Sequence, residues 1–231
     1  MSANYLIVGG TRGIGLATAR RLAPLGGRVI TTSRKPPESS EFECLPFDAT
    51  DADAELSLPD VLDGVVYCPG TITLKPFHRL DDAALLNDYE VNCLGAVRVL
   101  RQALGALKNS ESASVVLFST VAVCQGMPFH ASIAAAKGAV EGLTRSLAAE
   151  LAPKIRVNAI APSLTDTDLA AGLLSSEEKR KAAEGRHPLR RVSSPEDMAS
   201  LAAMLLSRDA AGITGQVLHP DNGLSSIQLF Q

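Results

Sequence analysis

Short runs of apolar, β-branched residues alternate along the chain with longer segments in which apolar residues recur at helical spacing. Each apolar run is nearly continuous, which is typical of strands that are buried on both faces. Seven such runs alternating with helices predict a mostly parallel seven-stranded sheet with helices on both faces, in one Rossmann-type, doubly wound α/β domain over residues 1–231. The expected strands are Tyr5–Val8, Val29–Thr32, Cys44–Phe47, Gly64–Tyr67, Ser114–Phe118, Ile155–Ile160 and Gln216–His219.

The helical segments are marked by their periodicity and by their end residues. Ser194 is expected to begin one helix, because a hydroxyl N-cap is followed there by Pro195 at the first helical position and by acidic residues in the first turn. The other expected helices are Gly13 to about Leu25, Leu56–Leu62, Asp82–Leu107 and Ser132–Leu151, the last of which stops before Pro153.

The composition is that of an ordinary globular protein, with 46% hydrophobic and 20% charged residues. A net charge of −3 argues against a protein built to hold nucleic acid or an anionic membrane. No apolar run reaches about 18 residues, and the N-terminus lacks the basic segment of a signal peptide. We therefore expect a soluble cytoplasmic protein.

The four cysteines have neither CxxC nor Cys/His spacing, so we expect no metal site. They are interpreted as buried thiols in a reducing compartment. They are Cys44, Cys68, Cys93 and Cys124.

Glycines follow the first expected strand and precede the first helix, in the run Val8-Gly-Gly-Thr-Arg-Gly-Ile-Gly15. Glycines at this place permit a tight turn and let the backbone approach a pyrophosphate at the N-terminus of the helix. A glycine pattern alone is weak evidence, but its position between a strand and a helix favours a dinucleotide site.

The end of the second strand indicates which dinucleotide is bound. An acidic residue there would bind the ribose 2′-hydroxyl and repel a 2′-phosphate, but the chain has Ser33 and Arg34 and no acid before Glu38. Arg34, together with Arg12 of the glycine turn, can pair with a 2′-phosphate. Such charge-assisted bonds contribute roughly 1.5–3 kcal/mol each, so we predict NADP(H).

These motifs, in this order, resemble the short-chain dehydrogenase/reductase family, and the resemblance runs from Tyr5 to about Gly223. It implies that Asp48 contacts the adenine, that Asn92 kinks the long helix and holds a proton-relay water, and that Lys137 binds the nicotinamide ribose.

The segment from Arg156 to Pro162, followed by Thr167, is similar to the family's segment that closes over the nicotinamide amide and the pyrophosphate. The family has Pro-Gly where this chain has Pro162-Ser163. The expected cofactor-binding residues are Gly9, Thr11, Arg12, Gly13, Ile14, Ser33, Arg34, Asp48, Ala49, Gly70, Lys137, Ser163, Thr165 and Thr167.

The chain departs from the family at the expected active site. The family's Asn-Ala-Gly after the fourth strand is Cys68-Pro69-Gly70 here, and its serine falls on Thr120. The family's tyrosine, four residues before Lys137, is replaced by Ile133. In the family this phenol gives a proton to the alkoxide as hydride arrives, and an isoleucine has no proton to give.

Several groups can replace the phenol. One is His130, which lies seven residues before Lys137. Some family members that reduce carbon–carbon double bonds have a Tyr-x₆-Lys spacing, and His130 occupies the position of that tyrosine. Because Pro128 lies just upstream, it stays open whether the helix extends back to His130. Thr120, or a water held by Asn92 and Lys137, would suffice if the substrate forms a delocalised enolate or is a protonated imine. Tyr67 and Tyr89 have no helical relation to Lys137. The expected catalytic residues are Asn92, Thr120, His130 and Lys137.

The sequence thus predicts an NADP(H)-dependent short-chain reductase that transfers hydride to an activated carbonyl, a conjugated C=C bond or an imine. Leu169, Leu173 and Leu174 lie in Asp168–His187, which corresponds to the family's substrate lid, and they suggest a small apolar substrate. Two alternatives stay open: a catalytically inactive NADP(H)-binding or scaffold protein, and a non-redox isomerase or dehydratase on the same fold. By resemblance, the two long helices would pair between subunits in a homodimer or homotetramer.

Overall fold

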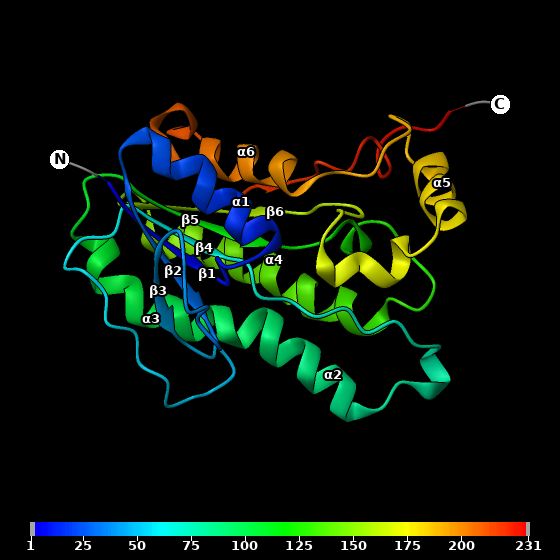
Figure 1. Cartoon of the computed structure of the whole chain (residues 1–231), viewed down its shortest axis with the longest axis horizontal. Coiled ribbons are helices and arrows are strands. Elements are labelled where there is room, and N and C mark those ends of the chain that lie inside the picture. Colours follow the sequence, from blue (N-terminus) through cyan, green and yellow to red (C-terminus); the bar gives the residue numbers. More distant parts are fainter. Residues whose placement is uncertain (1–2, 230–231) are drawn as a thin grey trace.

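A seven-stranded parallel sheet forms the middle layer of the computed structural model, which describes residues 3–229 (Figure 1). The strands are β1 (Asn4–Val8), β2 (Arg28–Ser33), β3 (Glu43–Pro46), β4 (Gly64–Tyr67), β5 (Ala113–Phe118), β6 (Ile155–Ile160) and β7 (Val217–Leu218). Their order in the sheet is β3-β2-β1-β4-β5-β6-β7, and every neighbouring pair is parallel. The doubly wound fold expected from the sequence is confirmed.

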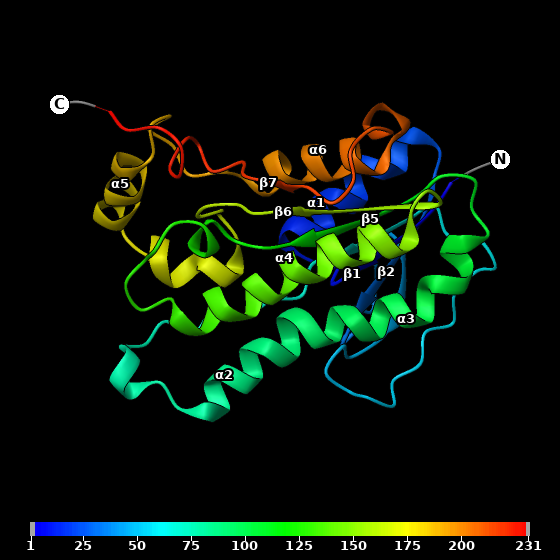
Figure 2. The same ribbon diagram turned by 180° about the vertical axis from the view of Figure 1, so that it is seen from behind.

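Helices cover both faces of the sheet, as Figures 1 and 2 show. On one face α1 (Gly13–Leu22) packs with α6 (Pro195–Leu206) over Ile7 and Val116. On the other, α3 (Gly95–Lys108) and α4 (Ala131–Leu151) pack over Leu6 and Val115. Successive strand residues thus enter opposite cores, which explains why each central strand is apolar at consecutive positions.

The predicted start of α6 is confirmed by a reciprocal capping box. The Asp197 N–H donates to Ser194 Oγ at 3.2 Å, and the Ser194 N–H donates to Asp197 Oδ2 at 2.8 Å. These bonds satisfy two backbone donors at the N-terminal end of the helix. A further helix, α5 (Glu177–Arg186), lies in the segment Asp168–His187, which the family resemblance compares with a substrate lid.

Two expected helices differ from the structure. The segment Leu56–Leu62 contains no helix. Pro59 has no N–H to donate within a helix, and the Leu56 N–H donates instead to the side chain of Gln102, to Oε1 at 2.8 Å. The segment Asp82–Leu107 is two helices, α2 (Asp82–Tyr89) and α3, joined by a π-helical turn at Glu90–Leu94. The family resemblance predicts a kink at Asn92, and Asn92 lies within this π-helical turn.

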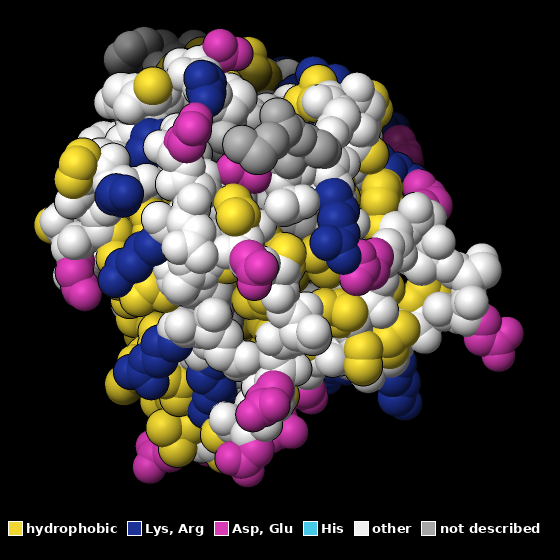
Figure 3. Space-filling model, turned by 90° about the vertical axis from the view of Figure 1, so that its left-hand side faces the viewer, with side chains coloured by type: hydrophobic (Ala, Val, Ile, Leu, Met, Phe, Trp, Pro, Cys, Tyr) yellow, Lys and Arg dark blue, Asp and Glu magenta, His cyan; other side chains and the backbone are white. Residues whose placement is uncertain are grey.

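Surface features of residues 3–229 bear on the expected location and partners. The described chain has no helix long and apolar enough to cross a membrane. On the face seen in Figure 3, basic and acidic side chains are interspersed. All four cysteines are free, but the expectation that all are buried is wrong: Cys93 is buried, Cys44 and Cys68 are half-buried, and Cys124 is exposed in the loop after β5.

Candidate active site

The glycine turn between β1 and α1 is shaped for close approach to its backbone. Gly9 and Gly13 have φ angles of +72° and +51°, which other residues rarely adopt. A Cβ placed at Gly15 would lie 2.3 Å from the Gly9 carbonyl oxygen. Because α1 begins here without an acidic residue in its first turn, its free N–H groups favour an anion. Of the other residues expected here, Thr11 is half-buried in the turn and Ile14 packs in the first turn of α1.

This turn lies where the sheet reverses its winding. β1 is flanked by β2 and β4, so the chain runs outward from it in both directions, and ligands of such sheets bind at the carboxyl ends of these strands. The loops after β1 and β4 meet, because a Cβ on Gly9 would lie 3.3 Å from Pro69 Cδ. The Cys68-Pro69-Gly70 loop therefore borders the glycine turn.

The segment after β6 also reaches the glycine turn. A Cβ on Gly13 would lie 3.6 Å from Thr167 Cγ2. Thr165 forms a parallel bridge with Ser193, which fixes the segment. Ser163 is buried, and its Oγ has no hydrogen-bond partner among residues 3–229. A buried hydroxyl without a partner among the described residues, four positions before the Thr167 contact with Gly13, fits a polar ligand such as a dinucleotide.

The residues expected at the adenine end cluster at the ends of β2 and β3. The Phe47 N–H donates to the Ser33 carbonyl oxygen at 3.0 Å, which places Asp48 and Ala49 beside β2. Hydrogen bonds from the Thr50 N–H and Oγ1 lower the pKa of Asp48, and Arg34 adds to this effect.

Arg12 and Arg34 are exposed, and neither forms an ion pair within the described chain. Both guanidinium groups are therefore available to a phosphate.

Lys137 and Asn92 converge on Gly70. A Cβ placed at Gly70 would lie 3.2 Å from Asn92 Oδ1 and 3.8 Å from Lys137 Nζ. Lys137 Nζ donates to the Phe118 carbonyl oxygen at 2.8 Å. Desolvation lowers the pKa of Lys137 to about 8, although Cys68, Cys93 and Asp88 act in the opposite direction.

The two candidate proton donors occupy different places. Thr120 begins the short 3₁₀ helix Val121–Val123; its Oγ1 accepts from the Ala122 N–H at 3.3 Å, and its O–H donates to no other residue that the structure describes. His130 is the N-cap of α4, and its Nδ1 lies 2.7 Å from the Pro128 carbonyl oxygen. α4 begins only at Ala131, and no hydrogen bond within residues 3–229 connects His130 with Lys137.

No tyrosine takes the place of Ile133, which is buried in the first turn of α4. Tyr67 donates to the Val91 carbonyl oxygen at 2.6 Å, and its burial raises its pKa well above the ordinary value. Tyr89 is 44% exposed on α2. The structure thus brings Asn92, Gly70 and Lys137 together and joins none of the tyrosines to them.

A buried acidic residue beside this group was missed by the sequence analysis. Asp88 lies fully buried on α2, and its carboxylate accepts hydrogen bonds from Thr71, Thr73 and Ser132. The signal was present, since Asp88 precedes Asn92 by four residues and therefore lies on the same side of the helix.

The comparison with known proteins identifies the family. The family described as enoyl-(acyl carrier protein) reductase matches residues 8–225. A tropinone reductase homologue of Arabidopsis thaliana is 34% identical over 242 residues, which cover 96% of this chain and 92% of the relative. The chain belongs to the short-chain dehydrogenase/reductase family.

Solved structures of short-chain dehydrogenases/reductases share the whole fold. The ligand-free aldohexose dehydrogenase of Thermoplasma acidophilum superposes with a TM-score of 0.90 at 27% identity, covering 100% of this chain and 98% of that one. ElxO with NADP bound superposes with a TM-score of 0.88 at 26% identity, covering 98% of this chain and 100% of ElxO. The relatives of this short-chain dehydrogenase/reductase thus include a reductase homologue and a dehydrogenase, and ElxO was solved with NADP bound.

Proposed function

We propose that the protein is an NADP(H)-dependent reductase that transfers hydride to an activated carbonyl, a conjugated C=C bond or an imine of a small apolar substrate. The observation that carries this proposal is the meeting of Lys137 Nζ and Asn92 Oδ1 at Gly70, in the loop that borders the glycine turn. An ammonium and an amide oxygen at this place can order a ribose, a water and a reacting group together.

The cofactor assignment rests on the groups left free around the glycine turn. Gly9 and Gly13 open the backbone to a pyrophosphate, and Ser163 offers a buried hydroxyl that has no partner in the part of the chain that the structure describes. Arg12 and Arg34 would hold the 2′-phosphate that distinguishes NADP from NAD. Similarity to ElxO, which was solved with NADP, supports the same choice. The bound nicotinamide would supply a hydride.

The proton must come from a group other than residue 133. The O–H of Thr120, which donates to none of residues 3–229, can donate to a negative oxygen that develops on the substrate. The Lys137 ammonium, with a pKa of about 8, is mostly charged at neutral pH and can deliver a proton through a water beside Asn92. We do not assign the proton to His130, because this residue is the N-cap that precedes α4, and its Nδ1 is bonded to the Pro128 carbonyl oxygen.

This weak proton donation favours substrates whose product anion is delocalised, or imines that are already protonated. The family description, an enoyl reductase, is consistent with a conjugated C=C bond. Leu169 Cδ2 lies 4.0 Å from the Cβ position of Gly70, and Leu169 and Leu173 are both exposed on the lid. An apolar substrate would cover these side chains.

Deuterium transfer tests the proposed reaction. NADPH deuterated at C4 would be incubated with ketones, enones, enoyl thioesters and cyclic imines, and the products examined by mass spectrometry. We expect deuterium in an activated class, its loss in Lys137→Ala and its retention in His130→Phe. If NADPH binds and no acceptor gains deuterium, a binding protein is indicated. Turnover without net NADPH oxidation would indicate an isomerase or dehydratase.

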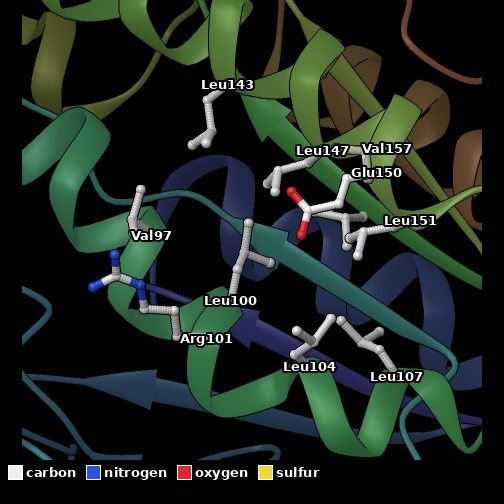
Figure 4. Close-up of a pocket in the computed structure, with 11 residues that line it drawn as sticks. Val97, Leu100, Arg101, Leu104, Leu107, Leu143, Leu147, Glu150, Leu151 and Val157 are labelled. Atoms are coloured by element: carbon white, nitrogen blue, oxygen red, sulfur yellow. The ribbon is translucent and has the colours of Figure 1, made fainter.

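We also propose that a second copy of this chain covers the groove between α3 and α4 (Figure 4). Half-buried leucines line both walls, and Arg101 on one wall and Glu150 on the other offer opposite charges. A two-fold axis would place each Arg101 against the partner's Glu150, which makes the groove self-complementary. The apolar residues used in this argument are Val97, Leu100, Leu104, Leu143, Leu147 and Leu151.

A further inference from the structure

The helices α2 and α4 pack against each other (Figure 2). Between them, Asp88 of α2 is the centre of a buried polar cluster. Its Oδ1 accepts from Thr71 Oγ1 at 2.6 Å and from Thr73 Oγ1 at 3.0 Å, and its Oδ2 accepts from Ser132 Oγ at 2.6 Å. No cation within residues 3–229 forms an ion pair with it. A buried carboxylate is costly unless its oxygens are hydrogen-bonded, and three hydroxyl donors meet that need here.

The carboxylate determines the direction of the hydrogen bonds around it. An ionised carboxylate only accepts, so the single hydroxyl proton of Thr71 is directed to Asp88. The Thr71 oxygen must then accept from its other neighbour, which is Asn92 Nδ2 at 2.8 Å. The Asp88 carbonyl oxygen also accepts from Asn92 Nδ2, at 2.7 Å.

This direction fixes which side of the Asn92 amide faces the active site. With Nδ2 held by Thr71 and by the Asp88 backbone, Oδ1 is turned toward Gly70, where Lys137 Nζ also lies. The Thr71 N–H approaches the same Oδ1 at 3.4 Å. An acceptor is therefore presented to the ammonium end of the site.

We propose that Asp88 is a positioning residue of the reduction: through Thr71 it holds the acceptor side of Asn92 toward Lys137, and through Thr71, Thr73 and Ser132 it ties the loop after β4 to α4. The inference rests on the proposed function. Asp88 does not itself touch substrate, because it is fully buried and both of its carboxylate oxygens are engaged.

The effect of Asp88 on the pKa of Lys137 gives a second way to test the proposed role of Asp88. The acidic groups that can raise the pKa of Lys137 when they are ionised are Cys68 of the loop after β4, Cys93 of the π turn and Asp88 of α2. Burial raises the pKa of the Cys68 thiol to about 12 and also raises that of Cys93, so both thiols stay neutral near pH 8. Asp88 is the one carboxyl group among these three, and its replacement by an amide should destabilise the charged form of Lys137.

The test uses the full chain with saturating NADPH and whichever acceptor gains deuterium. In Asp88→Asn, an amide of equal size replaces the carboxylate, and we expect kcat to fall about 10-fold to 100-fold while the substrate KM changes little. The basic limb of the pH profile should move to lower pH. Thr71→Val should lower kcat similarly without moving that limb, because the charge remains. Asp82→Asn, on the exposed first turn of α2, is the control and should change neither.

The side-chain amide resonances of Asn92, identified by their loss in Asn92→Ala, give a readout that needs no substrate. We expect them to shift in Asp88→Asn and in Thr71→Val but not in Asp82→Asn. Unchanged Asn92 resonances and an unchanged pH profile in Asp88→Asn would overturn the positioning role. If Asp88→Asn fails to fold, Thr71→Val decides, and unaltered Asn92 resonances there would overturn it. Absence of any reduction by the native protein would instead refute the proposed function, and the resonances would still decide the positioning.

Discussion

Lys137 on α4 is tied to Phe118, the last residue of β5, by a 2.8 Å hydrogen bond from Nζ to the carbonyl oxygen. This bond crosses from the helix layer to the end of the sheet and holds the ammonium close to the loop that carries Thr120. Because the ammonium is buried there, it keeps a charge only with the help of neighbouring dipoles and anions.

The activity should depend on the protonation of Lys137. Burial lowers the pKa of Lys137 to about 8, so the ammonium is present below that pH and lost above it. We expect kcat/KM for an activated acceptor to fall as pH rises through about 8. Lys137→Met should abolish most of the rate at all pH values. A profile that stays level on both sides of the Lys137 pKa would contradict the assignment.

Restoring a phenol at residue 133 should widen the substrate range. In Ile133→Tyr the hydroxyl would stand one helical turn before Lys137, and general acid catalysis typically contributes about 10²–10⁴-fold. We expect reduction of unactivated ketones to rise by a large part of that factor. Ile133→Phe adds the same ring without the hydroxyl, and thus separates proton donation from the crowding of a buried position. Equal rates in the two variants would exclude a role for the phenol.

Arg34 should control the choice between the two dinucleotides. Loss of a charge-assisted bond worth roughly 1.5–3 kcal/mol would weaken NADPH binding about 10-fold to 150-fold in Arg34→Ala. NADH affinity should stay the same, because NADH has no 2′-phosphate. Arg28→Ala, at the other end of β2 and paired with Glu43, serves as the control in the same binding titration. A parallel loss of NADH affinity would show that Arg34 acts on the fold and not on the phosphate.

Gly15 should tolerate no side chain. Its Cβ would lie 2.3 Å from the Gly9 carbonyl oxygen, so Gly15→Ala must shift the glycine turn at a cost of about 1–3 kcal/mol. We expect a lower melting temperature and weaker NADPH binding. Gly142→Ala, on α4 with open space around the new methyl group, should stabilise the protein slightly. Native-like NADPH affinity in Gly15→Ala would mean that the turn is not the phosphate site.

The groove between α3 and α4 should determine the oligomeric state. We expect sedimentation to show a dimer or tetramer for the native chain, and Leu147→Glu to be a monomer, because a carboxylate would be buried in an apolar contact. Arg101→Glu should weaken association and the added change Glu150→Arg should restore it. If the native chain is a monomer at micromolar concentration, the proposal that a second copy covers this groove is contradicted.

The fold was predictable because two periodicities dominate the sequence. Strand residues such as Leu6 and Ile7 are both apolar, since helices cover both faces of the sheet. The errors fall where side-chain hydrogen bonds or prolines override local pattern. Pro59 and the bond from Leu56 to Gln102 keep one leucine-rich segment from forming a helix, and no periodicity within that segment indicates a partner in α3.

The candidate site was only partly predictable. The glycine turn and Lys137 are local motifs, whereas the contact of Lys137 with Phe118 and the approach of Asn92 to Gly70 depend on packing between distant elements. Asp88 was missed for a related reason: its spacing of four residues from Asn92 places both on one side of the helix but does not indicate that Asp88 is buried. Its burial becomes visible only when Thr71 and Ser132 are brought to it.

The π turn at Glu90–Leu94 has a consequence for the length of this segment. It accommodates one more residue than an α-helical turn does. Deleting one residue there would let an uninterrupted α-helix form, and α3 would keep nearly the same orientation relative to α2, because the wider turn takes up its extra residue within about one rotation. The leucines of α3 would therefore stay in their groove, whereas we expect Asn92, which lies in the wide turn, to lose the hydrogen bonds that hold its amide. Such a deletion should abolish reduction and leave the oligomeric state unchanged.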